Sequence, residues 1–259
     1  MYFLEKNVIT KDQFCDARKN VLDNKETLSK VLSYGDNHNK QIIYRIPHTD
    51  FSNLKILTNT VISEKIISTL KKKFKKVFLI NLFYGTINSY TINAHKDGQS
   101  YQFKGKRAYE INQKTFKVIQ YFNDYEPHLM LSKLSSKPIN FFDNEKIFPL
   151  INHYYEKFFK KNFFFKNVDV KNYDALIMDN NTWHKTMKGT KINNQLINKS
   201  EDIRKIFISY DVVVDDIEIA KEYSHFLSEK YNFKTNYKKE LDFLLNTKLK
   251  LFDEVVDLS

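Results

Sequence analysis

Three widely separated segments of the chain carry side chains that can bind a metal ion or a carboxylate. His95-Lys96-Asp97 holds an imidazole and a carboxylate two residues apart, Trp183-His184 adds a second imidazole, and Arg204 adds a guanidinium. In an extended strand, residues i and i+2 point to the same side. His95 and Asp97 can therefore reach one ion together. The sequence thus offers a metal site built from two histidines and one carboxylate.

Two histidines and one carboxylate on one face of an iron are the ligand set of non-haem Fe(II) oxygenases, and this set leaves coordination positions open. His184 follows an apolar run at 175–178 that predicts a buried strand. Arg204 begins the β-forming run 204–214 and can bind a carboxylate through two parallel hydrogen bonds. Only four of the 42 basic residues are arginines, so a strand-heading arginine is informative.

The sequence leaves other candidates open. A second His-x-Asp, His48-Thr49-Asp50, has the same spacing but lies in a segment that we predict to be a loop. We prefer His95 and Asp97 because they lie between predicted strands. His128 and His153 are alternatives to His184, although neither is followed as closely by a strand that begins with arginine.

The elements that must position these residues follow from capping signals and periodicity. Thr10 and Gln13 form a capping box that opens a helix to about residue 22, and Ser63 caps a second, amphipathic helix. β-Forming runs predict strands at 77–84, 89–93, 115–122, 137–142, 175–178 and 204–214. Further helices are expected at 217–231 and 237–249, and the aromatic segment 148–165 fits either type of element. The pattern predicts a β-rich centre with helices at both ends.

Length and composition indicate a globular, cytoplasmic protein. The 259 residues suit one large domain, and 42% hydrophobic and 15% aromatic residues provide for a substantial core. The single Cys15 argues against a disulfide framework and fits a reducing cytosol. We expect no signal peptide and no membrane span, because the N-terminal residues lack the required pattern and no run of 18 uncharged apolar residues occurs.

The net charge of +11 comes mainly from lysines spread along the chain. Arginine, whose planar fork recognises bases and phosphates, is scarce. We therefore expect no specific nucleic-acid partner, and any association should weaken steeply with salt.

On these motifs the chain resembles the Fe(II)/2-oxoglutarate-dependent oxygenases, most closely the phytanoyl-CoA dioxygenase-like group. The matching segments are His95-Lys96-Asp97, the strand that leads to His184, and the strand that Arg204 begins. The resemblance implies one α+β domain over residues 1–259. Its double-stranded β-helix (jelly-roll) core would span about 77–214, with a helical part at about 1–76 and further helices at about 215–259.

The resemblance also implies roles for these residues. His95, Asp97 and His184 would bind Fe(II), and Arg204 would bind the distal carboxylate of 2-oxoglutarate. With O2 as the oxidant, 2-oxoglutarate would become succinate and CO2 while a small or carrier-bound organic substrate is hydroxylated. Asp97 favours hydroxylation or desaturation over halogenation, because a related halogenase has a small residue in place of that carboxylate.

The chain departs from the family pattern in two places. Arg204 lies 20 positions after His184, with a polar stretch at 188–202 that reads as a loop insertion, so Lys191 or Lys199 is an alternative anchor. Ile206 stands where a helper hydroxyl is expected. Two other functions remain open: a cupin-type metalloprotein that does not use 2-oxoglutarate, and a non-catalytic basic binding protein. Succinate formation with iron and 2-oxoglutarate distinguishes them from the oxygenase.

Overall fold

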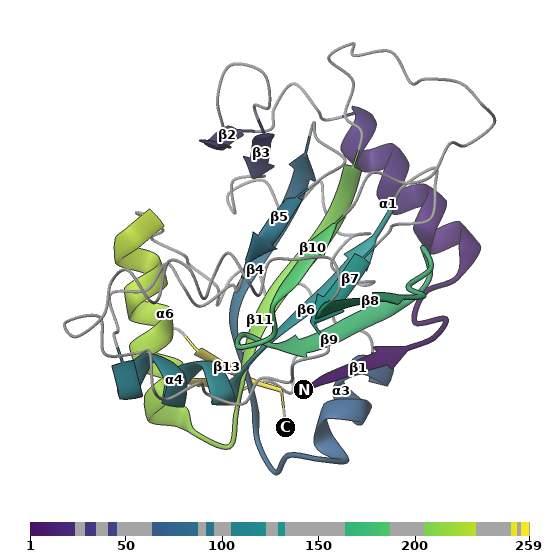
Figure 1. The fold of residues 1–259 in the computed structure, drawn as a ribbon. Helices are drawn as coiled ribbons and strands as arrows, with labels where there is room; N and C mark the ends of the chain where they lie inside the picture. Colours follow the sequence, from purple (N-terminus) through teal and green to yellow (C-terminus); the bar gives the residue numbers. More distant parts are fainter. Residues whose placement is uncertain are drawn as a thin grey trace.

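The strands of the chain form two antiparallel sheets that are flanked by helices (Figure 1). This computed structural model describes residues 1–23, 29–34, 41–45, 64–87, 92–95, 105–122, 129–132, 164–186, 205–231, 250–252 and 255–258. Every pairing between the described strands is antiparallel. The fold is therefore a mixed one, with antiparallel sheets and helices packed against them.

The larger sheet has the strand order β1-β9-β6-β11-β4-β13-β12, and β3 pairs with both β4 and β2. Its strands are β1 (Tyr2–Glu5), β2 (Ser29–Tyr34), β3 (Gln41–Arg45), β4 (Val77–Ile87), β6 (Thr115–Tyr121), β9 (Ala175–Asp179), β11 (Lys205–Val214), β12 (Lys250–Phe252) and β13 (Val255–Asp257). Every residue of β11 pairs with a residue of β4, so these two long strands form the centre of the sheet.

The smaller sheet has the order β5-β10-β7-β8. Its strands are β5 (Ile92–His95), β7 (Leu129–Ser132), β8 (Phe165–Val168) and β10 (His184–Thr186). Leu129, Leu131 and Val168 of this sheet form one buried cluster with residues of β6 and β9. Because the cluster draws on both sheets, the sheets pack face to face, and we call the region between them the inter-sheet interior.

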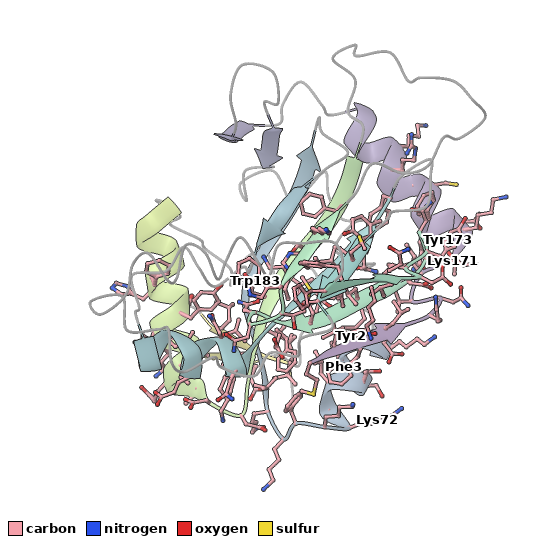
Figure 2. The ribbon with its side chains drawn as sticks, viewed as in Figure 1. Tyr2, Phe3, Lys72, Lys171, Tyr173 and Trp183 are labelled. Carbon is pink, nitrogen blue, oxygen red and sulfur yellow. The ribbon has the colours of Figure 1, made fainter. Side chains whose placement is uncertain are left out.

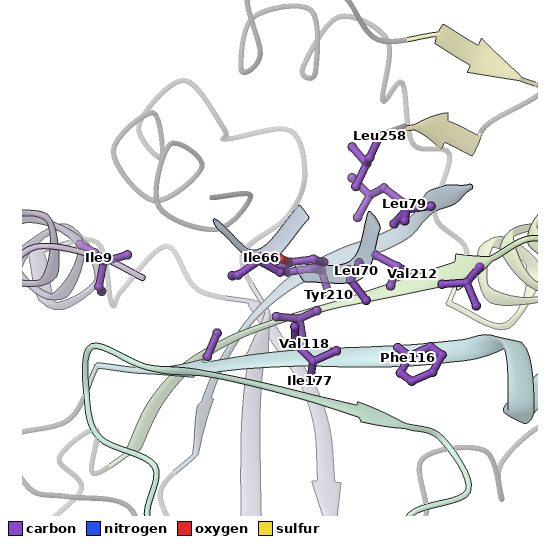
Figure 3. Packing of buried hydrophobic residues seen from close by; sticks show 14 of the residues in the cluster. Ile9, Ile66, Leu70, Leu79, Phe116, Val118, Ile177, Tyr210, Val212 and Leu258 are labelled. Carbon is purple, nitrogen blue, oxygen red and sulfur yellow. The ribbon is translucent and has the colours of Figure 1, made fainter. Parts of the chain in front are cut away.

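Helices cover the remaining faces of the larger sheet. They are α1 (Lys11–Asp23), α3 (Glu64–Lys71), α4 (Gly105–Lys114) and α6 (Ile217–Tyr231). Residues of α1 and α3 pack with Phe116, Val118 and Val212 on the face that points away from the smaller sheet (Figure 3). α4 and α6 pack with Phe78 and Val213 on the other face. None of the helices in the described part of the chain is long and apolar enough to cross a membrane.

The predicted helix starts agree with the structure where it describes them. Thr10 and Gln13 form the expected capping box: Thr10 N donates to Gln13 Oε1 (2.8 Å), and Gln13 N donates to Thr10 Oγ1 (3.2 Å). The predicted helix at 217–231 coincides with α6, whose first turn is capped by Asp216 Oδ1 accepting from Ile219 N at 3.0 Å. Ser63 and the predicted helix at 237–249 lie outside the described residues.

The capping box yields a stability prediction. Thr10→Ala should lower the free energy of unfolding by about 1 kcal/mol, because it leaves the backbone N–H of Gln13 without its acceptor. Chemical denaturation measures this difference. Thr10→Ser, which keeps the hydroxyl, should stay close to the parent, and equal losses in both variants would show that the hydroxyl does not cap α1.

Four predicted strands are confirmed as β4, β6, β9 and β11, while the fifth lies slightly later than expected, at β5 (Ile92–His95). β4 does not end at Gly85 as predicted, because Gly85 pairs with Phe207 of β11 and with Arg45 of β3. Of the ambiguous segment 148–165 the structure describes only the last two residues, where β8 begins. The predicted strand at 137–142 lies outside the described residues.

The two end regions of the chain, which we predicted to be helical, also contain strands. β1 pairs with β9, and β13 pairs with β4, so both end regions contribute strands to the larger sheet. Sequence periodicity missed these strands because they are only three or four residues long. It also missed α4, which lies between β5 and β6.

Candidate metal centre

The two histidines of the predicted metal site occupy directly opposite positions on neighbouring strands. His184, the first residue of β10, is paired with His95, the last residue of β5. Residues that face each other in an antiparallel pair lie on the same face of the sheet, with Cβ atoms roughly 4.5–5.5 Å apart. Imidazoles at two such positions can bind a single ion.

This pair of positions faces the inter-sheet interior. His184 is also paired with Leu131 of β7, which is fully buried in the cluster shared by the two sheets. Opposite residues share a face, so His184 lies on the side of the smaller sheet that points toward the larger one. A metal held here would be shielded from bulk water, since His184 itself is only 6% exposed.

The imidazole of His184 is oriented by the backbone that precedes it. Its Nδ1 lies 3.1 Å from the carbonyl oxygen of Thr182. Because a carbonyl oxygen can only accept a hydrogen bond, Nδ1 carries the proton in this contact. In the neutral ring Nε2 then carries the lone pair, which is the arrangement that metal-binding histidines use.

The neighbouring Lys185 lies on the other face of β10. It is paired with Met130 rather than with Leu131, and its Nζ lies 4.4 Å from the centre of the Phe165 ring. Burial lowers the pKa of Lys185 from its ordinary value. The ammonium group is thus directed away from the His184 side of the strand and contacts an aromatic face instead.

An ion pair between the buried Asp211 and the partly buried Lys117 lies on the larger sheet, on the face that points to the inter-sheet interior. Lys117 of β6 is opposite Asp211 of β11, and Lys117 Nζ lies 3.7 Å from Asp211 Oδ1. Lys117 shares its face with Ile119, which belongs to the cluster between the sheets. Sequence analysis missed this pair, because the opposition of Lys117 and Asp211 depends on the pairing of β6 with β11, which has no local signal.

The turn before β10 contains two further polar residues that sequence analysis missed. Asp179 and Thr182 are both buried, and the Thr182 hydroxyl donates to Asp179 Oδ1 at 2.9 Å. Trp183, which is labelled in Figure 2, lies at the end of the turn. Its carbonyl accepts a hydrogen bond from Ser132 N, which ties the turn to β7. Both ends of the turn are therefore fixed to sheet strands, and His184 follows directly.

The remaining predicted site residues lie outside the described part of the chain. Asp97 falls two positions after the end of β5, and Arg204 falls immediately before the start of β11. The alternatives also lie outside it: His48, His128, His153, Lys191 and Lys199. Among the described residues, no three His, Cys, Asp or Glu side chains come together as a metal site. The structure thus pairs His95 with His184, while Asp97 as the third metal ligand and Arg204 as the carboxylate-binding residue stay predictions.

Comparison with known proteins identifies the fold. No protein-family model matches the sequence, and no curated protein sequence matches it. Among solved structures, the non-haem α-ketoglutarate-dependent epimerase SnoN of nogalamycin biosynthesis is similar, with a TM-score of 0.54 and 9% identity over 82% of this chain and 78% of SnoN.

Two other proteins are similar to a comparable degree. HygX from Streptomyces hygroscopicus, solved with nickel, 2-oxoglutarate and hygromycin B, gives a TM-score of 0.51 and 10% identity over 83% of this chain and 82% of its own. The α-ketoglutarate-dependent carbocyclase SnoK gives 0.51 and 12%, over 83% and 80%. At such low identity these likenesses show a shared fold. The chain thus has the fold of enzymes that depend on 2-oxoglutarate, which is another name for α-ketoglutarate.

Proposed function

We propose that this chain is a non-haem Fe(II)- and 2-oxoglutarate-dependent oxygenase in which His95, Asp97 and His184 bind the iron. The observation that carries the proposal is the register of β5 and β10, which sets His95 opposite His184 on the face toward the inter-sheet interior. Asp97 follows His95 by two positions and would complete the two-histidine, one-carboxylate set that suits Fe(II).

The order in which the strands alternate between the sheets supports a jelly-roll core within a single domain. Between β4 and β11, the larger sheet contains β4, β6, β9 and β11, and the smaller sheet contains β5, β7, β8 and β10. The chain therefore crosses from one sheet to the other after every strand except β7. Eight strands shared in this way between two facing antiparallel sheets are typical of a double-stranded β-helix. The proposed core spans about 77–214, and the resemblance of its motifs supports the proposal that it belongs to the phytanoyl-CoA dioxygenase-like group.

The side chain of His184 fits the proposed metal, and the strand register places His95 opposite it. His184 is buried, and its Nδ1 proton is donated to a carbonyl, so Nε2 is the nitrogen that would bind iron. Iron and 2-oxoglutarate together would supply the activation of O2, and Arg204 would hold the distal carboxylate of 2-oxoglutarate. The remaining contribution of this chain is to exclude water from the site and to orient the substrate.

The proposed substrate is a small or carrier-bound organic molecule, and the proposed reaction is hydroxylation. HygX has been solved with hygromycin B bound and SnoN with nogalamycin RO, so this fold accommodates small molecules. SnoN and SnoK are an epimerase and a carbocyclase. Product mass distinguishes the outcomes: one added oxygen indicates hydroxylation, an unchanged mass indicates epimerisation, and the loss of two hydrogens indicates desaturation or ring closure.

Metal-dependent binding of 2-oxoglutarate tests the proposed function. Calorimetric titration without oxygen should give binding of 2-oxoglutarate to the Fe(II)-loaded protein, with affinity at least about tenfold weaker for the metal-free protein. On admission of air, the loaded protein should form succinate, and a screen of metabolites should find substrates that accelerate it. Metal binding without any 2-oxoglutarate binding would support the cupin-type alternative, and no metal binding would support a non-catalytic protein.

A further inference from the structure

We infer that the turn at residues 179–182 fixes the imidazole of His184 in its Nδ1-protonated form, with Asp179 and Thr182 as positioning residues. The inference rests on the proposed function, because the turn would serve to present Nε2 of His184 to the metal. It extends the proposed site by two buried polar residues that carry no metal-ligand role themselves.

The turn is held closed by two hydrogen bonds between the same pair of residues. Thr182 N donates to the carbonyl oxygen of Asp179 at 3.0 Å, and Thr182 Oγ1 donates to Asp179 Oδ1 at 2.9 Å. The first bond closes the backbone turn, and the second adds a side-chain closure that a valine or alanine could not make. Together they fix the direction in which the carbonyl of Thr182 points.

That carbonyl is the group that accepts from His184 Nδ1 at 3.1 Å. A carbonyl held in place accepts a hydrogen bond from only one of the two neutral tautomers of imidazole, the one protonated at Nδ1, so the turn selects between them. Hydrogen-bonded outer partners of this kind orient metal-binding histidines and raise their basicity. The side chain of Asp179 therefore acts on His184 through Thr182.

The turn is also attached to the larger sheet, which limits its movement. Asn180 N donates to the carbonyl of Thr115 at 3.0 Å, and Asp179 N donates to the carbonyl of Met1 at 2.9 Å. Asp179 Oδ2 also contacts the Met1 nitrogen. Because Asp179 and Thr182 are both buried, loss of the hydrogen bond between their side chains leaves a buried polar group without its partner, which is costly.

Nitrogen NMR of the metal-free protein tests the inference without reference to catalysis. The imidazole nitrogens of the seven histidines can be labelled, and the His184 signals assigned by their loss in His184→Ala. The parent should show His184 protonated at Nδ1. Thr182→Val, which keeps the side-chain shape but removes the hydroxyl, should show a mixture of tautomers. Thr182→Ser, which restores the hydroxyl, should return the parent spectrum.

Co(II) affinity, measured by competition with a chelator, provides the second readout. Thr182→Val and Asp179→Ala should each weaken Co(II) binding by about tenfold, which is the lower end of the effect of outer-shell substitutions. The double variant should be little weaker than the more affected single variant, because both substitutions break the same bond.

Thr115→Val is the matched control. Thr115 is fully buried, and its hydroxyl donates to the carbonyl of Ile111 at 2.7 Å. The substitution removes this hydroxyl and leaves the Thr115 backbone carbonyl, which accepts from Asn180 N, in place. This variant should lose thermal stability to a similar extent as Thr182→Val while it keeps the parent tautomer and the parent Co(II) affinity.

Three results would overturn the inference: parent His184 protonated at Nε2, a parent mixture of tautomers, or Thr182→Val indistinguishable from Thr115→Val in both readouts. The failure of the proposed function has a different signature. If His184→Ala bound Co(II) as tightly as the parent, the metal site would be wrong, whereas the metal-free spectra would still decide whether the turn holds the imidazole.

Discussion

His95→Ala and His184→Ala are each expected to weaken metal binding by more than about a hundredfold. Substitution of an outer-shell partner alone costs about 10–100-fold, and a site with three protein ligands loses a bond when either histidine is removed. Fe(II) binding in the absence of oxygen and Co(II) binding by chelator competition measure the effect. Because His184 is buried, the thermal stability of the metal-free variants should be recorded beside the affinities.

Two histidines outside the proposed site provide controls. His225 is exposed on α6, and His48 belongs to the second His-x-Asp of the sequence. His225→Ala and His48→Ala should both bind metal as the parent does. A loss of metal in His48→Ala would mean that the other His-x-Asp supplies the ligands, and unchanged binding in both His95→Ala and His184→Ala would rule out the proposed metal centre.

The long central elements were predictable from sequence because local chemistry determines them. The capping box at Thr10 and the apolar face with Ile66 and Leu70 need only neighbouring residues to be recognised, and both produce the expected helices. The strands that become β4 and β11 are long runs of β-forming residues. Their pairing with each other, across more than 100 positions of sequence, has no local signal.

The short strands were missed for the converse reason. β7, β10 and β1 contain three or four residues each, too few for a period-2 pattern to stand out. They become strands because a neighbouring strand offers unpaired backbone groups, as β9 does for β1. Tertiary pairing therefore decides these elements.

The metal centre shows the same division between local and long-range information. Residue types and the His-x-Asp spacing identified His95 and His184 as candidates, since extended geometry alone dictates which neighbours share a side. Their direct juxtaposition depends on the register of β5 against β10, which a shift of one residue would destroy. The support that Thr182 gives to His184 is short-range, but it requires the turn geometry, which the sequence did not reveal.

Arg204→Ala is expected to weaken 2-oxoglutarate binding on the order of a hundredfold while metal content stays near that of the parent. The proposed contact is a pair of charge-assisted hydrogen bonds between the guanidinium and the distal carboxylate, and removal of one side of such a pair costs roughly 2–5 kcal/mol. Arg204→Lys should fall between the two, because lysine keeps the charge and loses the planar fork. Calorimetry of the metal-loaded variants gives the affinity, and succinate formation gives the functional consequence.

The comparators for this experiment are the lysines that can compete for the role of anchor. Lys191 and Lys199 lie in the predicted loop insertion, and Lys205 begins β11. Lys205 is included because odd-numbered positions of β11 such as Phe207 face the inter-sheet interior. If Arg204→Ala behaves like the parent and one lysine-to-alanine variant loses 2-oxoglutarate binding, that lysine is the anchor. If none of these alanine variants alters 2-oxoglutarate binding, the carboxylate is held elsewhere or the protein does not use 2-oxoglutarate, and the parent titration separates these two cases.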